Sequence, residues 1–179
     1  MLEKIIFAGF GGQGIVLMGK AVAYAGMKEG RHVTHFPAYG VAMRGGTATC
    51  TVVVSDDEIA SPVVPAPDTV IAMNQPSADK YFPMIRPGGR MYINSDLVES
   101  RKYRDDIQVI PIPANAIAEA CGTIKIANMA MLGAYAGNSG VVTTETLKKM
   151  VPEMVSKRRQ ELVKANLEAI DQGAAAGKK

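Results

Sequence analysis

The sequence predicts a single α/β domain with a mostly parallel sheet flanked by helices and a helical C-terminal part. Three observations favour this fold class. Short apolar runs rich in β-branched residues alternate with helical segments, as in βαβ units. A glycine-rich turn joins the first run to the first helix, and the last third of the chain has the pattern of successive helices.

Composition and length agree with one ordinary globular domain. The chain has 179 residues, of which 47% are hydrophobic and 21% charged. We expect the domain to span residues 1–171, with the small and polar residues 172–179 forming a flexible tail. The net charge of +3 is scattered along the chain, which argues against a nucleic-acid partner. We find neither a signal peptide nor an apolar stretch of ~20 residues, so a cytoplasmic protein without membrane contact is expected.

Six segments have the apolar, β-branched character of strands. They are residues 4–8, 32–36, 47–54, 69–73, 90–94 and 107–112. The second is expected to end at Pro37, because proline cannot donate a ladder hydrogen bond. The three prolines of residues 61–68 predict a rigid connector.

Helices are expected between and after these runs. Apolar residues at intervals of three and four predict the first helix from Ile15, and Gly30 is a suitable residue to end it. A short helix between the fourth and fifth runs has Ser77 as its N-cap candidate. Later helices are expected at 114–120, 127–137, 144–149 and 156–170.

The first loop contains Gly9, Gly11 and Gly14 in the pattern G-x-G-x-x-G, between a strand and a helix. Such glycines let backbone N–H groups at a helix N-terminus approach an anion closely. A dinucleotide site also needs an acid about 20 residues on, after the second strand. The nearest acid, Glu29, precedes that strand. A dinucleotide site, a site for another anion, and a tight turn that only packs the helix on the sheet all remain open.

Gln13 does not decide between these interpretations, because its amide can bind a ligand, a partner or the local backbone. The second glycine-rich loop, residues 37–46, is expected at the same edge of the sheet. In it, Arg44 can bind a carboxylate or phosphate, or order its own loop through carbonyl groups. Tyr39 offers the amphipathic surface that is common in interfaces.

Catalytic and metal-binding patterns are not found. Cys50 and Cys121 form no C-x-x-C motif, and His32 and His35 are the only histidines. These residues do not predict an iron–sulfur or zinc site. There is also no G-x-S-x-G motif. We expect no catalytic residue, no metal site and two buried free thiols.

Taken together, the two loops resemble those of the gamma subunit of 2-oxoacid:ferredoxin oxidoreductases. The resemblance covers residues 3–140. Its residues are Gly9-Phe10-Gly11-Gly12-Gln13-Gly14, Tyr39-Gly40, Arg44-Gly45-Gly46, Val52-Val53-Val54-Ser55-Asp56, Glu58-Ile59, Pro62, Pro67-Asp68, Gln75, Lys80-Tyr81, Ala127-Asn128-Met129 and Leu132-Gly133.

The resemblance implies a Rossmann-like domain and a role in a larger complex. These complexes decarboxylate a 2-oxoacid on thiamine diphosphate, pass electrons through iron–sulfur clusters to ferredoxin, and form an acyl-coenzyme A. The cofactors belong to alpha- and beta-type subunits and, where one exists, a ferredoxin-like delta subunit. This chain is therefore expected to be an assembly subunit that binds no cofactor alone and is inactive by itself.

The resemblance also implies which residues bind a cofactor or a neighbouring subunit. They are Gly9, Gly11, Gly12, Gln13, Gly14, Tyr39, Gly40, Arg44, Gly45, Gly46 and Asn128. Relatives often carry an acid two positions before the arginine, where this chain has Ala42, so an ion pair between them cannot form here. The second loop is closer to 2-oxoglutarate or branched-chain types than to pyruvate types. Three alternatives stay open: a subunit of an indolepyruvate-type complex, a free-standing dinucleotide-binding reductase, and a regulatory module for a phosphorylated metabolite.

Overall fold

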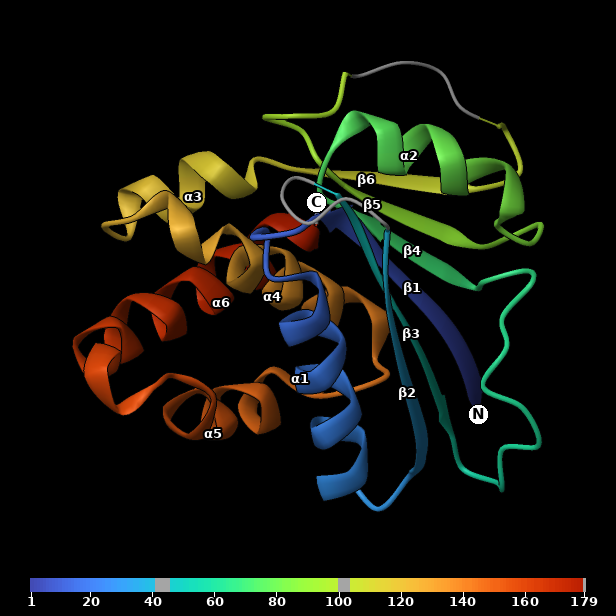
Figure 1. Cartoon of the computed structure of the whole chain (residues 1–179), viewed down its shortest axis with the longest axis horizontal. Helices are drawn as coiled ribbons and strands as arrows, with labels where there is room; N and C mark the ends of the chain where they lie inside the picture. Colours follow the sequence, from blue (N-terminus) through green and yellow to red (C-terminus); the bar gives the residue numbers. More distant parts are fainter. Residues whose placement is uncertain (41–45, 100–103, 179) are drawn as a thin grey trace.

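A six-stranded sheet with the order β2-β3-β1-β4-β5-β6 forms the centre of the molecule (Figure 1). The computed structural model describes residues 1–40, 46–99 and 104–178. The strands are β1 (Leu2–Phe10), β2 (His32–Tyr39), β3 (Thr47–Ser55), β4 (Thr69–Ala72), β5 (Arg90–Asn94) and β6 (Gln108–Ile112). The pairs β1–β4, β4–β5 and β5–β6 are parallel, whereas β3 is antiparallel to both β1 and β2. The predicted α/β class with a mostly parallel sheet is confirmed.

The helices lie unequally on the two faces of the sheet. They are α1 (Ile15–Lys28), α2 (Gln75–Tyr81), α3 (Ala114–Ala120), α4 (Ala127–Ser139), α5 (Thr144–Met154) and α6 (Val163–Gly177). Three short 3₁₀ helices are η1 (Phe82–Met84), η2 (Ile124–Ile126) and η3 (Lys157–Leu162). Figure 1 shows α1, α4 and α6 on one face and α2 on the other.

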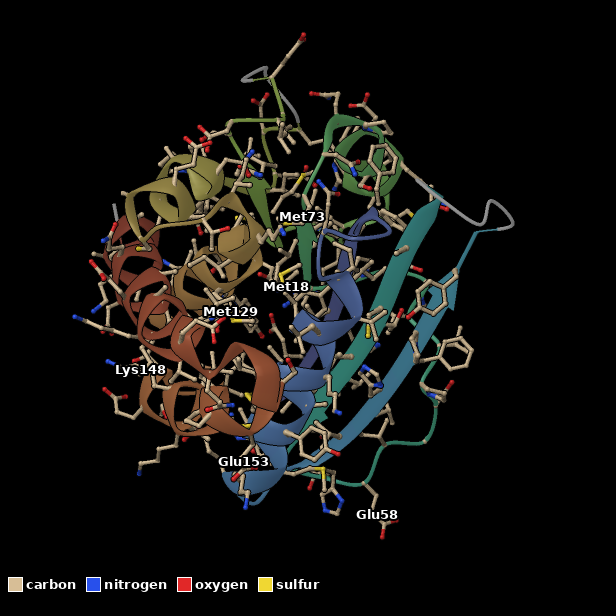
Figure 2. All side chains as sticks on the ribbon, turned by 60° about the vertical axis from the view of Figure 1, so that its left-hand side comes forward. Met18, Glu58, Met73, Met129, Lys148 and Glu153 are labelled. Atoms are coloured by element: carbon tan, nitrogen blue, oxygen red, sulfur yellow. The ribbon has the colours of Figure 1, made fainter. Side chains whose placement is uncertain are left out.

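The alternation of side chains along β1 divides the core into two clusters. Ile5 and Phe7 belong to the larger cluster, beneath α1 and α4, and Ile6 and Ala8 belong to the smaller one, beneath α2. In the larger cluster, the ring of Tyr135 meets Phe7 and Tyr92 edge to face, with centroids 6.5 and 5.8 Å apart. Met18, Met73 and Met129 lie in this core (Figure 2).

Two expectations about element ends are wrong. β2 does not stop at Pro37 but runs on to Tyr39. The proline is tolerated because β2 is an edge strand, which leaves half of its backbone groups unpaired. The N-cap of α2 is Asn74 rather than Ser77, since the Asn74 side chain accepts a hydrogen bond from the Ser77 N–H at 3.0 Å.

The C-terminal part is more ordered than the composition predicts. α5 extends to Met154, with Pro152 in its last turn. The segment expected to be one helix at 156–170 is divided into η3 and α6. α6 continues to Gly177, so residues 172–177 are part of the packed domain and not of a flexible tail.

α6 is held by close backbone contact with α4. A Cβ on Gly173 would lie 2.0 Å from the carbonyl oxygen of Ala130, and one on Gly133 would lie 2.1 Å from that of Ile170. No side chain fits at such a distance from a carbonyl oxygen. The glycines therefore allow the two helices to touch along their backbones.

The end of α1 is tied to the start of α5. The Glu29 carboxylate accepts hydrogen bonds from the backbone N–H and the hydroxyl of Thr143, both at 2.9 Å. Thr143 is itself the N-cap of α5. Glu29, the acid that lies nearest before the second strand in the sequence, thus has a structural partner.

Candidate functional site

The two glycine-rich loops lie at one edge of the sheet. Because β2 and β1 run in the same direction, their carboxyl ends lie at the same edge, on either side of the start of β3. The Gly11 N–H donates a hydrogen bond to the Gly46 carbonyl at 2.9 Å. The Gly40 N–H donates to the Thr47 carbonyl at 2.7 Å. Arg44 and Gly45, also predicted for this site, lie outside the described residues.

Gln13 fastens the first loop to the end of β4. Its side-chain oxygen accepts from the Phe10 N–H at 2.7 Å and from the Asn74 amide at 2.9 Å. Its side-chain nitrogen donates to the Met73 carbonyl at 3.2 Å. The amide therefore binds the local backbone at Phe10, one of the three roles the sequence left open, and also two distant residues, Met73 and Asn74.

This bridge spans the point where the chain changes from one face of the sheet to the other. α1 follows β1 onto one face, and α2 follows β4 onto the opposite face (Figure 1). In open α/β sheets, ligands bind in the crevice at such a point. Here a hydrogen bond between Gln13 and Asn74 joins the ends of β1 and β4 at that point.

Three glycines of the first loop have different reasons to be glycine. Gly12 and Gly14 have φ of 96° and 75°, in the left-handed region. Gly9 lies in β1, where a Cβ would be 2.5 Å from Cδ1 of Ile15. The turn and the close approach of α1 to the sheet account for all three. Gly14 is also the N-cap of α1, which has no side-chain cap and no acid in its first turn.

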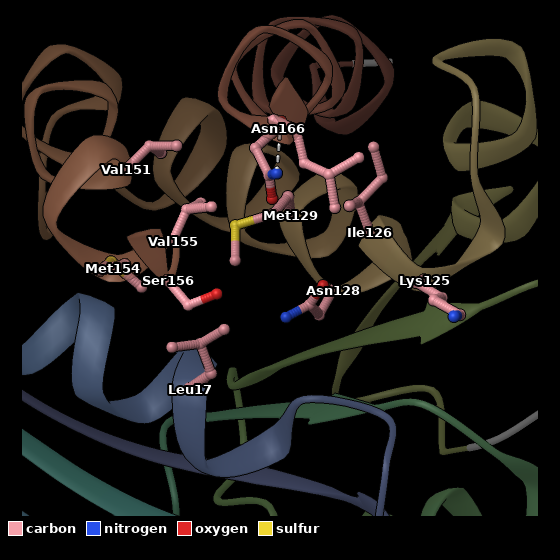
Figure 3. Close-up of a pocket in the computed structure, with 11 residues that line it drawn as sticks. Leu17, Lys125, Ile126, Asn128, Met129, Val151, Met154, Val155, Ser156 and Asn166 are labelled. Carbon is pink, nitrogen blue, oxygen red and sulfur yellow. Dashed lines mark hydrogen bonds between the residues drawn. The ribbon is translucent and has the colours of Figure 1, made fainter. Parts of the chain in front are cut away.

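Asn128, predicted from a distant part of the chain, lies directly against Gly14. A Cβ on Gly14 would be 2.3 Å from the Asn128 amide nitrogen. Asn128 is only 5% exposed. It also lines a cavity of about 250 Å³ between α1, α4, α5 and the start of the C-terminal helices (Figure 3).

Tyr39 stands apart from this buried group. It ends the edge strand β2 and is 71% exposed, and Phe36 on the same strand is 59% exposed. The face of β2 and β3 that is turned away from α1 carries an open groove, lined among others by Phe36, Val63 and Met84. An exposed edge strand with two large aromatic side chains is suited to contact with another chain.

The described residues form neither a metal-ligand cluster nor a membrane-spanning helix. Within ranges 1–40, 46–99 and 104–178, no three His, Cys, Asp or Glu side chains gather as metal ligands would. No helix in these ranges is both long and apolar enough to cross a bilayer. Cys50 is buried in β3, where burial raises the pKa of its thiol to about 12. Cys121 is only partly buried, so the prediction of two buried thiols holds for one.

Sequence reasoning missed Asn74 and most of the cavity. Asn74 carried a usable signal, because an asparagine three residues before Ser77 and directly after a buried run is a favoured N-cap. Ser156 and Asn166 carried none. They reach the cavity only through the packing of α5 and α6 against α4.

Sequence comparison assigns the chain to a family. The sequence model described as pyruvate ferredoxin/flavodoxin oxidoreductase matches residues 4–176. The chain belongs to this family. The ketoisovalerate oxidoreductase subunit VorA of Methanothermobacter marburgensis is 35% identical over 171 residues, covering 96% of this chain. The 2-oxoglutarate synthase subunit KorC of Methanocaldococcus jannaschii is 34% identical over 176 residues, 97% of this chain and 92% of KorC. The chain spans 36% of the length of VorA.

Two solved structures of this oxidoreductase family have the same fold. A keto/oxoacid ferredoxin oxidoreductase gamma subunit from Geobacter sulfurreducens has a TM-score of 0.84 and 29% identity, with 98% of both chains covered. The 2-oxoglutarate:ferredoxin oxidoreductase from Magnetococcus marinus has a TM-score of 0.88 and 26% identity. It covers 99% of this chain, which corresponds to 31% of that longer chain. The resemblance to a gamma subunit is confirmed.

Proposed function

We propose that this chain is the gamma-type subunit of a cytoplasmic 2-oxoacid:ferredoxin oxidoreductase. In this complex, a 2-oxoacid is oxidatively decarboxylated to an acyl-coenzyme A, and ferredoxin takes up the electrons. The observation that carries the proposal is the match to KorC over almost the full length of both proteins. The gamma subunit from Geobacter sulfurreducens matches equally completely.

In this proposal, the reacting cofactors are held by other subunits. Cys50 lies in the middle of β3 and Cys121 directly after α3, and in the described ranges neither belongs to a group of three or more potential metal ligands. These residues do not fit an iron–sulfur cluster, which is held by several thiolates. We therefore assign the clusters and thiamine diphosphate to alpha-, beta- or delta-type partners.

In this proposal, the chain itself contributes a contact surface for those partners at one edge of its sheet. Hydrogen bonds fix the ends of β1 and β2 on either side of the start of β3, so Tyr39 and Phe36 are presented on a defined surface. We assign this surface to contact with a neighbouring subunit.

The test of this assignment is co-purification with tagged alpha- and beta-type subunits of the same organism. Tyr39→Asp should lower the recovered amount at least severalfold, whereas Tyr24→Asp, at an exposed tyrosine of α1, should leave it unchanged. Equal recovery of both variants would remove Tyr39 from the interface.

The decisive experiment for the function is reconstitution. The alpha- and beta-type subunits are assayed with and without this chain, with thiamine diphosphate and coenzyme A, for reduction of ferredoxin by 2-oxoglutarate. Activity should depend on this chain. Full activity of a complex that lacks it, or failure of the chain to join the complex, would overturn the proposal.

A branched-chain 2-oxoacid is the second candidate substrate. VorA, named for ketoisovalerate, is 35% identical to the matching part of this chain, about the same as KorC. The same assay with 3-methyl-2-oxobutanoate, pyruvate and indolepyruvate in place of 2-oxoglutarate ranks the substrates by kcat/KM.

A free-standing dinucleotide-binding reductase is not favoured. In a dinucleotide fold, the strand that carries the ribose-binding acid lies beside the first strand. Here the antiparallel β3 occupies that position and separates β2 from β1. Titration with NAD and NADP checks this, and binding in the micromolar range would contradict it.

A further inference from the structure

The cavity beside the N-terminus of α1 has the form of a small-molecule site. Its volume is about 250 Å³. Its walls are mainly apolar, with Leu17, Met129, Val151, Met154 and Val155 among them. Since an engineered cavity of about 150 Å³ accommodates benzene, this one has room for about eight to ten non-hydrogen atoms.

One buried polar side chain in the cavity has no partner. Asn128 is 95% buried, and no described residue forms a hydrogen bond with its amide. Figure 3 shows its nitrogen and the Ser156 hydroxyl pointing toward one another across the cavity. The other buried amide, that of Asn166, already donates to the Leu162 carbonyl at 2.6 Å. The Asn128 amide therefore opens onto the cavity and is free to form hydrogen bonds with a molecule bound there.

The electrostatic surroundings favour a negative charge on that partner. Asn128 lies against Gly14, the N-cap of α1. The first hydrogen bond of this helix runs from the Met18 N–H to the Gly14 carbonyl, so the N–H groups of residues 15–17 have no acceptor within the helix. The partial positive charge of the helix end is not compensated by a capping side chain or a first-turn acid. Lys125 also lines the cavity, and no aspartate or glutamate does.

We propose that this cavity binds a small aliphatic carboxylate of about six to eight carbons, in addition to the function proposed above. The carboxylate would accept from the Asn128 amide and the Ser156 hydroxyl near the end of α1. The hydrocarbon part would lie among Met129, Val151 and Val155. A nucleotide does not fit this volume, and an inorganic anion would leave the apolar walls uncovered.

The first test uses three probes on the full chain. ¹⁵N-labelled protein is titrated with 4-methylpentanoate, with the uncharged 4-methylpentanamide and with acetate. The first should shift the amide signals of Gly14 to Leu17 and of Asn128 saturably. The other two should bind at least about tenfold more weakly, as expected when either the charged hydrogen bonds or the apolar contacts are lost. No saturable shift with 4-methylpentanoate, or equal affinity for its amide, would overturn the proposal.

The second test changes the charge at Asn128 without changing its shape. Asn128→Asp keeps the packing against Gly14 but places a carboxylate in the cavity, and should abolish binding. Asn138→Asp makes the same change on the same helix, outside the cavity lining, and should retain it. Unchanged binding by Asn128→Asp would contradict the assigned role. The probe comparison on the unmodified chain decides the matter even if that variant does not fold.

Discussion

At the scale of single residues, Gly12 and Gly14 allow backbone strain to be distinguished from a side-chain clash as the reason why a position needs glycine. Both have a backbone φ in the left-handed region. A Cβ at Gly12 would meet nothing within 4 Å, whereas a Cβ at Gly14 would clash with the Asn128 side chain. Gly12→Ala should therefore cost only the backbone strain, about 1–2 kcal/mol of unfolding free energy. Gly14→Ala should cost about 2–4 kcal/mol, because the clash adds to the strain. Urea denaturation measures both, and equal losses would show that Asn128 moves aside freely.

The two cysteines should differ in reactivity. Burial raises the pKa of Cys50 to about 12, and the residue is fully inaccessible in the fold. The Cys121 thiol also has a raised pKa, through burial first and the Glu168 charge second, but it is partly accessible. A thiol reagent reacts with the thiolate. At pH 8 we expect one thiol to be labelled in the folded chain and both after denaturation. Mass spectrometry of the labelled peptides identifies which is which.

Residue types and local spacing were enough to predict the turn formed by the first loop. They were not enough to decide what Gln13 does, because its partners Met73 and Asn74 are about 60 positions away in the chain. The same holds for Asn128. Its position in a helix was predicted from the sequence, but its contact with Gly14 depends on how α4 packs against α1.

At the scale of helices, the α4–α6 contact reverses the usual effect of a glycine replacement. Inside a helix, Gly→Ala normally stabilises by about 0.5–1 kcal/mol. Gly173→Ala should instead destabilise by about 2–3 kcal/mol, because its Cβ would meet the Ala130 backbone. Gln172→Ala, on the preceding residue, is the matched control and should be close to neutral. Thermal unfolding of both variants checks the prediction, and a stabilised Gly173→Ala would refute the close contact.

The hydrogen bonds between Glu29 and Thr143, which connect α1 to α5, should make the stability of the fold depend on pH. Partial burial raises the pKa of Glu29, but hydrogen bonds from Thr143 and Thr146 and the charge of Arg31 together lower it below its usual value near 4.5. Because the folded-state pKa is the lower one, this carboxylate stabilises the fold above pH ~5, and the contribution is lost as the pH falls through the folded-state pKa. Glu29→Gln should therefore be less stable than the original chain at pH 7, and the difference in unfolding free energy should shrink as the pH falls below 4.5. A difference that stays constant over this range would contradict the assignment.

Helices and strands with a regular pattern were predicted well, and their ends less well. The strands at 90–94 and the helix at 114–120 have the predicted bounds. The prediction of a flexible tail was wrong for residues 172–177. Small residues such as Gly173 and Ala174 are typical both of flexible ends and of tightly packed helices. Only the partner helix distinguishes the two cases, and its position is not encoded locally.

At the scale of the whole molecule, the sequence predicted the class of the sheet but not its order. The alternation of strands and helices indicated parallel neighbours, which β1, β4, β5 and β6 are. Nothing local showed that β3 would insert between β1 and β2. That choice follows from the long ladder between β1 and β3, which pairs residues from Leu2 to Phe10 with residues from Ser55 to Thr47.

The edge strand β2 has a consequence for how the protein is produced. Its outer backbone groups are unpaired, and Phe36 and Tyr39 are exposed beside them. Such an edge can pair with the same edge of another molecule and start aggregation. Under the function proposed above, neighbouring subunits would cover this strand, and a cell that made this chain in excess of them would accumulate insoluble protein. Balanced synthesis of the proposed subunits is the requirement that follows from this one strand.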